Sequence, residues 1–265
     1  MTAGRLTATF DGLRARGAKG LVTYVTAGDP DLARSAAVIR SIARAGADVI
    51  EVGVPFSDPL ADGPVIQRAT ERALAAGATL AGTLDLVASV RHDVDAPFVL
   101  FSYVNPILRM GMEAFVDRAA DAGVDGVLLL DLPIEESDSM RAALDRRGLD
   151  QIFLVSPTTT DARLAAAARL GRGFLYAISR LGVTGTRDSV AASAEPLAAR
   201  IRAKTRLPLA LGFGISRPEH VRQVWSFADA AVVGSALVAA IGAAAANGGD
   251  PAGAAGALVR ELKGP

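Results

Sequence analysis

Short apolar runs alternate with longer amphipathic stretches along most of this chain. The short runs have the length of buried strands, and the longer stretches carry apolar residues at helical spacing. The expected strands are residues 21–28, 48–54, 98–103, 126–132, 151–156, 173–179, 208–212 and 230–233. The expected helices are residues 31–45, 64–76, 83–91, 112–122, 135–147, 161–170, 192–204, 218–227 and 236–245.

Strands that alternate with helices favour a parallel sheet, and about eight such units can close it into a barrel. The predicted fold class is therefore α/β, a single (β/α)8 TIM barrel with an extra N-terminal helix and a short C-terminal helical tail. No linker or change of composition interrupts the chain before the tail, so residues 1–265 are expected to form one domain. The alternative is an open doubly wound sheet, but no glycine-rich dinucleotide turn follows the first strand.

Two local signals mark the junctions between strands and helices. Asp29 followed by Pro30 predicts a helix N-cap with proline at the first helical position. The sequence Ala-Gly-x-Asp ends at Asp48 and again at Asp125, and a weaker form contains Asp229. At each of these junctions we expect a helix to end and a buried strand to begin.

The composition argues against several classes of function. The formal net charge is zero and the pI is about 6.8, so electrostatics gives no reason to expect nucleic acid or an anionic membrane as a partner. The chain has no cysteine, which excludes disulfides and thiolate chemistry. No run of about 18 apolar residues occurs, and the first residues show helical spacing rather than a signal peptide. A soluble cytoplasmic protein is expected.

The distribution of lysine and histidine narrows the chemistry further. Lys19, Lys204 and Lys263 all lie outside the expected strands, which argues against a Schiff-base mechanism in the barrel. His92 and His220 are far apart in the sequence, so no metal site is expected. The chemistry should be acid/base catalysis by carboxylates, without a metal or a covalent cofactor.

Residues 48–64 carry the strongest candidate for such chemistry. Glu51 is a single charged residue inside an apolar strand run, on the same strand face as Gly53, which leaves room for a group to approach it. A buried, unpaired carboxylate is costly when ionised, so the pKa of Glu51 should be raised. The loop that follows adds Asp58 and Asp62, which suggests an acid/base site at the mouth of the sheet. The alternative is a structural glutamate that pairs with an arginine or with backbone amides.

Glycine-rich turns follow the last two expected strands. Residues 212–216 and 234–235 lie at the carboxyl ends of these strands, each directly before a helix. Backbone amides of such turns, in the last two units of a barrel, frequently bind phosphate. The sequence therefore predicts a phosphate site at these turns, with amides rather than lysine side chains as the donors.

Four segments resemble the tryptophan synthase α subunit family. They are TAGDP at 26–30, EVGVPFSDPLADGP at 51–64, GVTG at 182–185 and GFGIS at 212–216. The resemblance extends from about residue 21 to residue 238 in the order and spacing of the family. It implies an enzyme of tryptophan biosynthesis, a lyase that cleaves indole-3-glycerol phosphate to indole and glyceraldehyde 3-phosphate in a retro-aldol step.

The resemblance also implies a role for each site residue. Glu51 would give a proton to C3 of the indole and take one from the side-chain hydroxyl, and Asp62 would hold the indole N–H and stabilise the positive charge. Thr184 would belong to a lid that orders Asp62 when it closes. The substrate would contact Phe101, Tyr103, Leu128, Tyr176, Thr184 and Phe213, with Leu100 as a further wall, and the phosphate would contact Gly185, Gly214, Gly234 and Ser235.

The family works with a second protein, the β subunit, which carries pyridoxal phosphate and consumes the indole. The resemblance therefore implies an α2β2 heterotetramer, with no cofactor in this chain and with the partner in contact with Pro55, Phe56, Asp58 and a loop at residues 103–109. One alternative is a stand-alone lyase that releases free indole. The other is a weakly active phosphate-binding barrel that acts as an allosteric partner.

Overall fold

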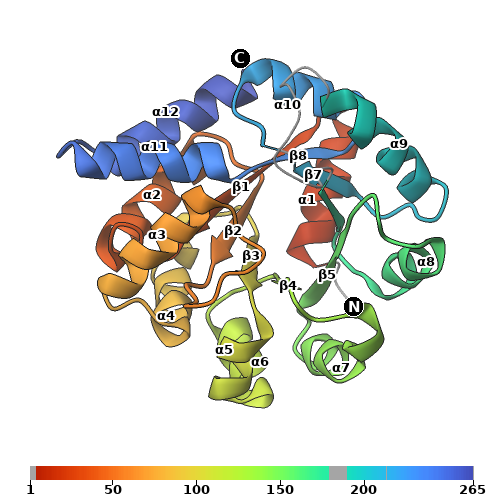
Figure 1. The fold of residues 1–265 in the computed structure, drawn as a ribbon, viewed down its shortest axis with the longest axis horizontal. Helices are drawn as coiled ribbons and strands as arrows, with labels where there is room; N and C mark the ends of the chain where they lie inside the picture. Colours follow the sequence, from red (N-terminus) through yellow and green to blue (C-terminus); the bar gives the residue numbers. More distant parts are fainter. Residues whose placement is uncertain (1–3, 179–189, 213, 265) are drawn as a thin grey trace.

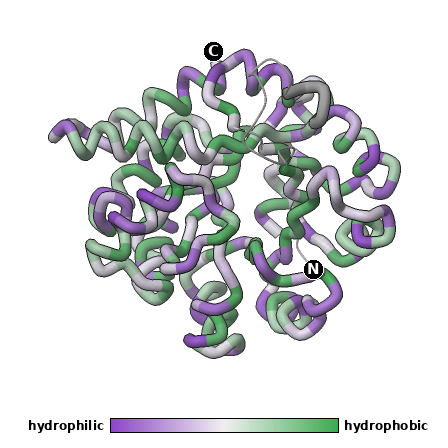
Figure 2. Tube along the Cα trace, in the orientation of Figure 1, coloured by the Kyte–Doolittle hydropathy of each residue, from purple (hydrophilic) through white to green (hydrophobic). Residues whose placement is uncertain are grey.

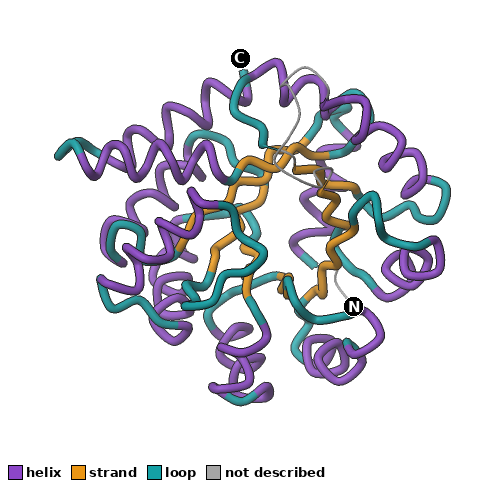
Figure 3. The backbone as a smooth tube through the Cα atoms, viewed as in Figure 1, coloured by secondary structure: helices purple, strands orange, loops and turns teal. Residues whose placement is uncertain are grey.

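The computed structural model describes residues 4–178, 190–212 and 214–264. Within these residues eight parallel strands close into a barrel in sequence order, and helices surround it (Figures 1 and 3). The predicted (β/α)8 TIM barrel is confirmed. The strands are β1 (Gly20–Thr26), β2 (Val49–Gly53), β3 (Phe98–Ser102), β4 (Gly126–Leu129), β5 (Asp150–Val155), β6 (Leu175–Ile178), β7 (Leu209–Gly212) and β8 (Ala230–Val233).

The helices that surround the barrel mostly combine hydrophilic and hydrophobic residues along their length (Figure 2). No single helix in the described ranges is both long and apolar enough to span a membrane, and α3 with the segment Leu80–Asp93 would reach that length only as a pair bent by 93°. The α-helices are α1 (Arg5–Ala15), α2 (Leu32–Arg44), α3 (Pro64–Ala75), α4 (Leu80–Val90), α5 (Val104–Met110), α6 (Met112–Asp121), α7 (Asp138–Arg146), α8 (Asp161–Leu170), α9 (Val190–Arg202), α10 (Pro218–Trp225), α11 (Ser235–Ala246) and α12 (Pro251–Lys263).

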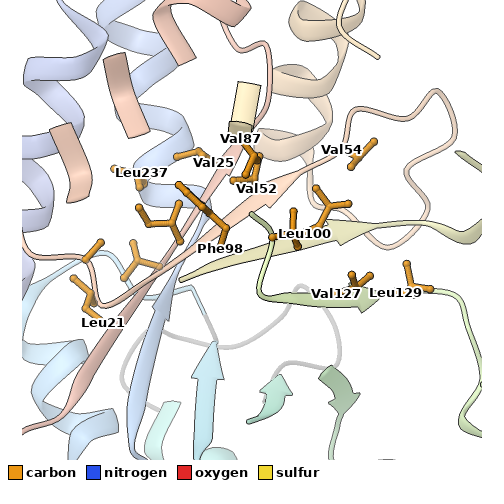
Figure 4. Close-up of a cluster of buried hydrophobic side chains, with 14 of the residues drawn as sticks. Leu21, Val25, Val52, Val54, Val87, Phe98, Leu100, Val127, Leu129 and Leu237 are labelled. Carbon is orange, nitrogen blue, oxygen red and sulfur yellow. The ribbon is translucent and has the colours of Figure 1, made fainter. Parts of the chain in front are cut away.

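The side chains of each strand alternate between two hydrophobic cores. Val52 and Leu100 belong to the outer core between strands and helices, part of which is drawn in Figure 4. Val49 and Val99 belong to the inner core that fills the barrel. Glu51 shares the inward face of β2 with Val49, so strand alternation directs its carboxylate into the barrel. Leu100 faces outward, and its expected place in the wall of the substrate slot is wrong.

Helix α1 closes the end of the barrel where the strands begin. Leu6, Phe10 and Leu13 are almost fully buried and join the inner core. The rings of Phe10 and Phe174 lie 5.6 Å apart, and Phe174 directly precedes β6. The carboxyl ends of the strands, at the opposite edge, are where the active sites of this fold lie.

Aspartates directly before β2, β4 and β8 tie neighbouring strands together, and we call these contacts the strand latches. Each carboxylate accepts a hydrogen bond from a backbone N–H of the preceding strand, which satisfies a donor at the floor of the barrel. The Ala-Gly-x-Asp junctions of the sequence thus have a structural explanation. The three latches, each 2.8 Å long, are Asp48 with Leu21, Asp125 with Phe98 and Asp229 with Leu209.

Each strand latch is completed by a basic side chain from another part of the fold. These basic partners are Lys263 of α12 at 2.9 Å from Asp48, Arg91 at 3.3 Å from Asp125, and Arg202 beside Asp229. The strands β5 and β6 have no latch of this kind, because the residue directly before β6 is Phe174 instead of an aspartate.

The predicted N-cap at Asp29 and Pro30 is wrong. The side chain of Asp31 caps α2 and accepts a hydrogen bond of 2.8 Å from the backbone N–H of Arg34. Asp29 instead binds Arg72 of α3 through two hydrogen bonds of 2.8 Å. This ion pair joins the loop after β1 to a helix 43 residues away, which a local capping signal cannot reveal.

The segment before α6 differs from expectation, and the C-terminal tail is helical as predicted. Residues 103–109 were expected as a loop, but most of them form α5. The expected short C-terminal tail is a helix of 13 residues that packs against α2 and α11. Its residues Ala255 and Val259 are fully buried, so α12 is part of the outer layer of the barrel.

Candidate active site

Glu51 lies inside the barrel with no exposed surface. Both oxygens of its carboxylate are buried and have no hydrogen-bond partner among the described residues. Burial raises the pKa of Glu51 to about 8, because the apolar surroundings disfavour the charged form. The arginine or amide partner that a purely structural glutamate needs is not found in the described part of the chain.

Asp62 lies in the loop between β2 and α3 and is held by Tyr103. The hydroxyl of Tyr103 donates a hydrogen bond of 3.1 Å to Oδ2 of Asp62 and accepts one of 2.9 Å from the backbone N–H of Ala61. Burial raises the pKa of Asp62, and the bond from Tyr103 opposes that shift. Tyr103, expected to contact substrate, therefore also orients one of the two candidate catalytic carboxylates.

Aromatic and apolar side chains surround Glu51 inside the barrel. Phe101 stands between two tyrosines, with its ring centroid 5.2 Å from that of Tyr24 and 6.4 Å from that of Tyr176. Leu128 is fully buried and belongs to the same inner core. The structure thus brings together Phe101, Leu128 and Tyr176, three of the residues expected to contact substrate, on neighbouring inward faces.

Tyr24 of β1 is a site residue that the sequence analysis missed. Its hydroxyl fills the space above Gly53, where an added Cβ would lie only 2.1 Å from the phenol oxygen. The room that Gly53 was expected to leave beside Glu51 is therefore occupied by a phenol. The alternation of side chains along a strand could have revealed it, because Tyr24 lies on the same inward face of β1 as the inner-core residue Val22.

The expected phosphate turns lie on adjacent strands at the active-site edge. Strands β7 and β8 pair through Gly212 and Val232, so the turns that follow them are neighbours. Gly214 has a φ of 82°, a backbone conformation that favours glycine. Gly234 is the N-cap of α11 and Ser235 is its first residue, so the first amides of this helix are free to bind an anion. Thr184, Gly185 and Phe213 lie outside the described residues.

One face next to the site is apolar and hollowed. Leu60 in the loop after β2 is 94% exposed and Leu108 on α5 is 63% exposed, while Leu74 on α3 is also exposed. These are the exposed large hydrophobic side chains of the described residues. Phe56 and Leu74 line two cavities of about 430 and 420 Å³. Leu60 lines the second cavity, and α5, which carries Leu108, borders the first through Asn105, Pro106 and Arg109. Exposed apolar surface beside cavities is typical of a docking site for another protein.

The fold and this site define a class of protein, a (β/α)8 barrel with one carboxyl group buried inside the barrel and a second in a loop at the carboxyl ends of its strands. Within this class, the chain belongs to the tryptophan synthase alpha chain family. The family profile described as "Tryptophan synthase alpha chain" matches residues 10–263. The predicted family is confirmed.

Individual relatives agree with this assignment. Over 234 residues, 88% of either protein, the chain is 50% identical to the tryptophan synthase alpha chain of Solibacter usitatus and 52% identical to that of Geotalea uraniireducens. The crystal structure of tryptophan synthase subunit alpha from Legionella pneumophila is 39% identical, with a TM-score of 0.89, over 99% of this chain and 98% of that one. A Mycobacterium tuberculosis tryptophan synthase structure is 39% identical, with a TM-score of 0.90, over the same shares.

Membership of this family makes the chain a lyase of tryptophan biosynthesis. Its reaction is the cleavage of indole-3-glycerol phosphate to indole and glyceraldehyde 3-phosphate. The predicted reaction is thereby confirmed, and the two alternatives are not favoured.

Proposed function

We propose that Glu51 and Asp62 are the two catalytic carboxylates of this cleavage. The observation that supports the proposal best is the Glu51 carboxylate, which is buried inside the barrel without a partner among the described residues and has a pKa of about 8. Such a perturbed group in an apolar environment is suited to give and to take a proton near neutral pH. We also propose that residues 1–265 form a single domain, as the sequence predicts.

Glu51 starts the reaction in its protonated form. It gives its proton to C3 of the indole ring, which converts the ring into an iminium that can accept electrons. The resulting carboxylate takes the proton of the side-chain hydroxyl, the C–C bond breaks, and its electron pair returns to the ring. The products are indole and the aldehyde, and Glu51 ends protonated as it began, so no net proton is consumed.

Asp62 acts in its ionised form. Its carboxylate accepts a hydrogen bond from the indole N–H and stabilises the positive charge that forms on the ring. The bond from Tyr103 fixes the carboxylate and favours its charged form. Two carboxylates in different surroundings thereby take different roles, because burial keeps Glu51 neutral while Asp62 retains a donor.

The substrate would lie between the carboxylates and the phosphate turns. Phe101, Leu128 and Tyr176 would form walls of the indole slot, together with Tyr103. The amides of Gly214, Gly234 and Ser235 would bind the phosphate at the start of α11. By resemblance to the family, Thr184, Gly185 and Phe213 complete the substrate and phosphate contacts.

We further propose that the apolar face of Leu60, Leu74 and Leu108 docks a tryptophan synthase β subunit in an α2β2 assembly. This face includes Pro55 and Phe56, which line one of its cavities. It also continues directly into the loop that carries Asp62, so a docked partner would restrict the position of a catalytic residue. The pyridoxal phosphate of the pathway would be bound by that partner.

A direct assay tests the proposed function. The purified chain should convert indole-3-glycerol phosphate to indole and glyceraldehyde 3-phosphate at a measurable rate, and a β subunit should increase that rate. Full activity without the β subunit would instead indicate a stand-alone lyase. Absence of cleavage in both conditions, with the substrate still bound, would indicate an allosteric barrel without catalysis.

The rate should decrease on the alkaline side of pH 8. Glu51 must begin protonated, so kcat/KM is retained below its pKa of about 8 and decreases about tenfold per pH unit above it. Asp62 must be ionised, so an acidic limb should lie above the ordinary range of an aspartate, since its pKa is raised. The substrate phosphate titrates near pH 6 as well, which makes the basic limb the diagnostic one. A profile that stays flat from pH 7 to pH 10 would contradict the role of Glu51.

Replacing Leu108 by lysine should weaken the β subunit complex by about tenfold or more, because a charge would be placed at an apolar contact. The activity of the isolated chain should stay within about twofold of wild type, since Leu108 is 63% exposed on α5 and outside the barrel. The dissociation constant can be measured by calorimetry. The control is Gln223→Lys, which adds the same charge at an exposed position of α10, away from α5 (Figure 1). It should leave binding of the β subunit unchanged. Equal weakening by both variants would argue against this docking face.

A further inference from the structure

Tyr24 occupies the centre of the site and has no assigned role in the reaction as proposed above. It is 5% exposed on β1 and is the register partner of Glu51 in the β1–β2 pair. Its hydroxyl lies where a side chain of residue 53 would begin, two residues beyond Glu51 on the same strand face. Residues 51 and 53 are about 6.6 Å apart along the strand, so the Tyr24 hydroxyl occupies the side-chain position next to Glu51 on the same face.

The ring of Tyr24 is fixed by its neighbours. It packs edge-to-face on Phe101 at a centroid distance of 5.2 Å. On another side, a Cβ added to Gly234 would be 3.5 Å from the Tyr24 Cβ. The residue therefore contacts both the indole slot and the turn proposed to bind phosphate, and its hydroxyl has a defined position.

The proton of the Tyr24 hydroxyl is available for a further bond. The hydroxyl oxygen accepts a hydrogen bond of 3.4 Å from Oγ1 of Thr26, and its own proton makes no hydrogen bond to any described residue. The oxygens of Glu51 likewise have no donor in the described ranges. A donor without an acceptor and an acceptor without a donor thus lie on adjacent strands, facing the same interior.

The ionisable neighbours of Tyr24 are two carboxyl groups and a phenol. Burial, Asp62 and Glu51 all raise the pKa of its phenol, and the neighbouring phenol of Tyr103 adds to the effect. Burial and Glu51 also raise the pKa of the Tyr176 phenol on β6. Because its pKa is raised, the Tyr24 phenol keeps its proton throughout the pH range of the reaction and can donate a hydrogen bond without ionising.

We propose that Tyr24 is a positioning residue for the lyase reaction, whose hydroxyl donates a hydrogen bond to the Glu51 carboxylate while Glu51 is ionised. The inference rests on the proposed function, in which Glu51 is transiently charged between giving one proton and taking another. A carboxylate without a donor in an apolar interior is strongly disfavoured. The hydrogen bond stabilises this ionised state and orients the carboxylate toward the hydroxyl proton that it must remove.

The substitution Tyr24→Phe tests the proposal, because it keeps the ring and its contact with Phe101 and removes the hydroxyl. We expect kcat to decrease about tenfold to a hundredfold, with KM within about twofold of wild type. The basic limb of the kcat/KM profile should shift upward by about one pH unit, since the ionised form of Glu51 loses its donor. A change in packing alone would not move that limb.

The matched comparison is Tyr176→Phe, which removes the other phenol that faces Glu51. Its basic limb should stay at the wild-type position. A shift in Tyr176→Phe with none in Tyr24→Phe would overturn the proposal and assign the donor to Tyr176. An unshifted limb in both variants, with wild-type kcat, would also overturn it.

Failure of this inference can be told apart from failure of the proposed function. If Glu51→Gln were active, the proposed role of Glu51 would be wrong whatever Tyr24→Phe shows. If Glu51→Gln is inactive and Tyr24→Phe has a wild-type profile, only the role of Tyr24 is refuted.

Discussion

Glu51→Gln should lose cleavage of indole-3-glycerol phosphate by about 10²–10⁴-fold or more, while the barrel stays folded. Glutamine has nearly the same shape but can neither give a proton to the indole ring nor take one from the hydroxyl. The carboxyl group of Glu51 is buried and has no hydrogen-bond partner among the described residues. Its pKa of about 8 is close to neutral pH. The loss should therefore appear in kcat, measured by release of glyceraldehyde 3-phosphate at steady state.

Two controls make this result interpretable. Glu261→Gln changes an exposed glutamate of α12 and should retain wild-type kcat. Circular dichroism and thermal unfolding of Glu51→Gln should match those of wild type at neutral pH, because glutamine replaces a carboxyl group that is neutral below its pKa of about 8. Near wild-type kcat in Glu51→Gln would show that Glu51 is structural, and the central proposal would be wrong.

Asp62→Asn should reduce kcat by about 10²–10³-fold, since a neutral amide cannot stabilise positive charge on the indole ring. The hydrogen bond from Tyr103 can still be accepted by the amide oxygen, so the loop should keep its position. Substrate affinity should be within a few-fold of wild type, because the phosphate turns provide much of the binding. Calorimetric titration of the variant with substrate checks this. Lost affinity with unchanged kcat would mean that Asp62 binds substrate and does not stabilise the transition state.

Patterns that depend on strand periodicity were readable from the sequence. The eight strands and the closed barrel follow from short apolar runs that alternate with amphipathic helices, and the common face of Glu51 and Val49 follows from side-chain alternation along β2. The same reasoning applied to β1 would have placed Tyr24 beside Glu51. It was missed because tyrosine in a strand looks like ordinary core, and only the glycine at position 53 creates the space for its hydroxyl.

Features that depend on distant partners were not readable. Asp29 and Asp31 are equivalent as capping signals, and Arg72 determines which of them is free to cap α2. The expected loop at residues 103–109 mostly forms α5, and Pro106 lies in the first turn of that helix, where proline is tolerated. The glycines of α12 lower its intrinsic helix propensity. One of them, Gly256, allows the helix to pack closely on α2, because a Cβ at this position would lie 2.4 Å from Oγ of Ser41.

The strand latch at Asp48 has a consequence for the order in which the barrel is completed during synthesis. Its basic partner, Lys263, lies 215 residues later in the chain, so the first two strands leave the ribosome long before their ion pair can form. Asp48 can accept the backbone N–H of Leu21 early, but the lysine reaches it only when α12 docks on α2. Contacts across such long separations form late, because a large loop must close first. The amino-terminal strands therefore acquire their final stability only with the last helix, and a ribosome-bound chain stopped before α12 should remain sensitive to proteases at β1 and β2.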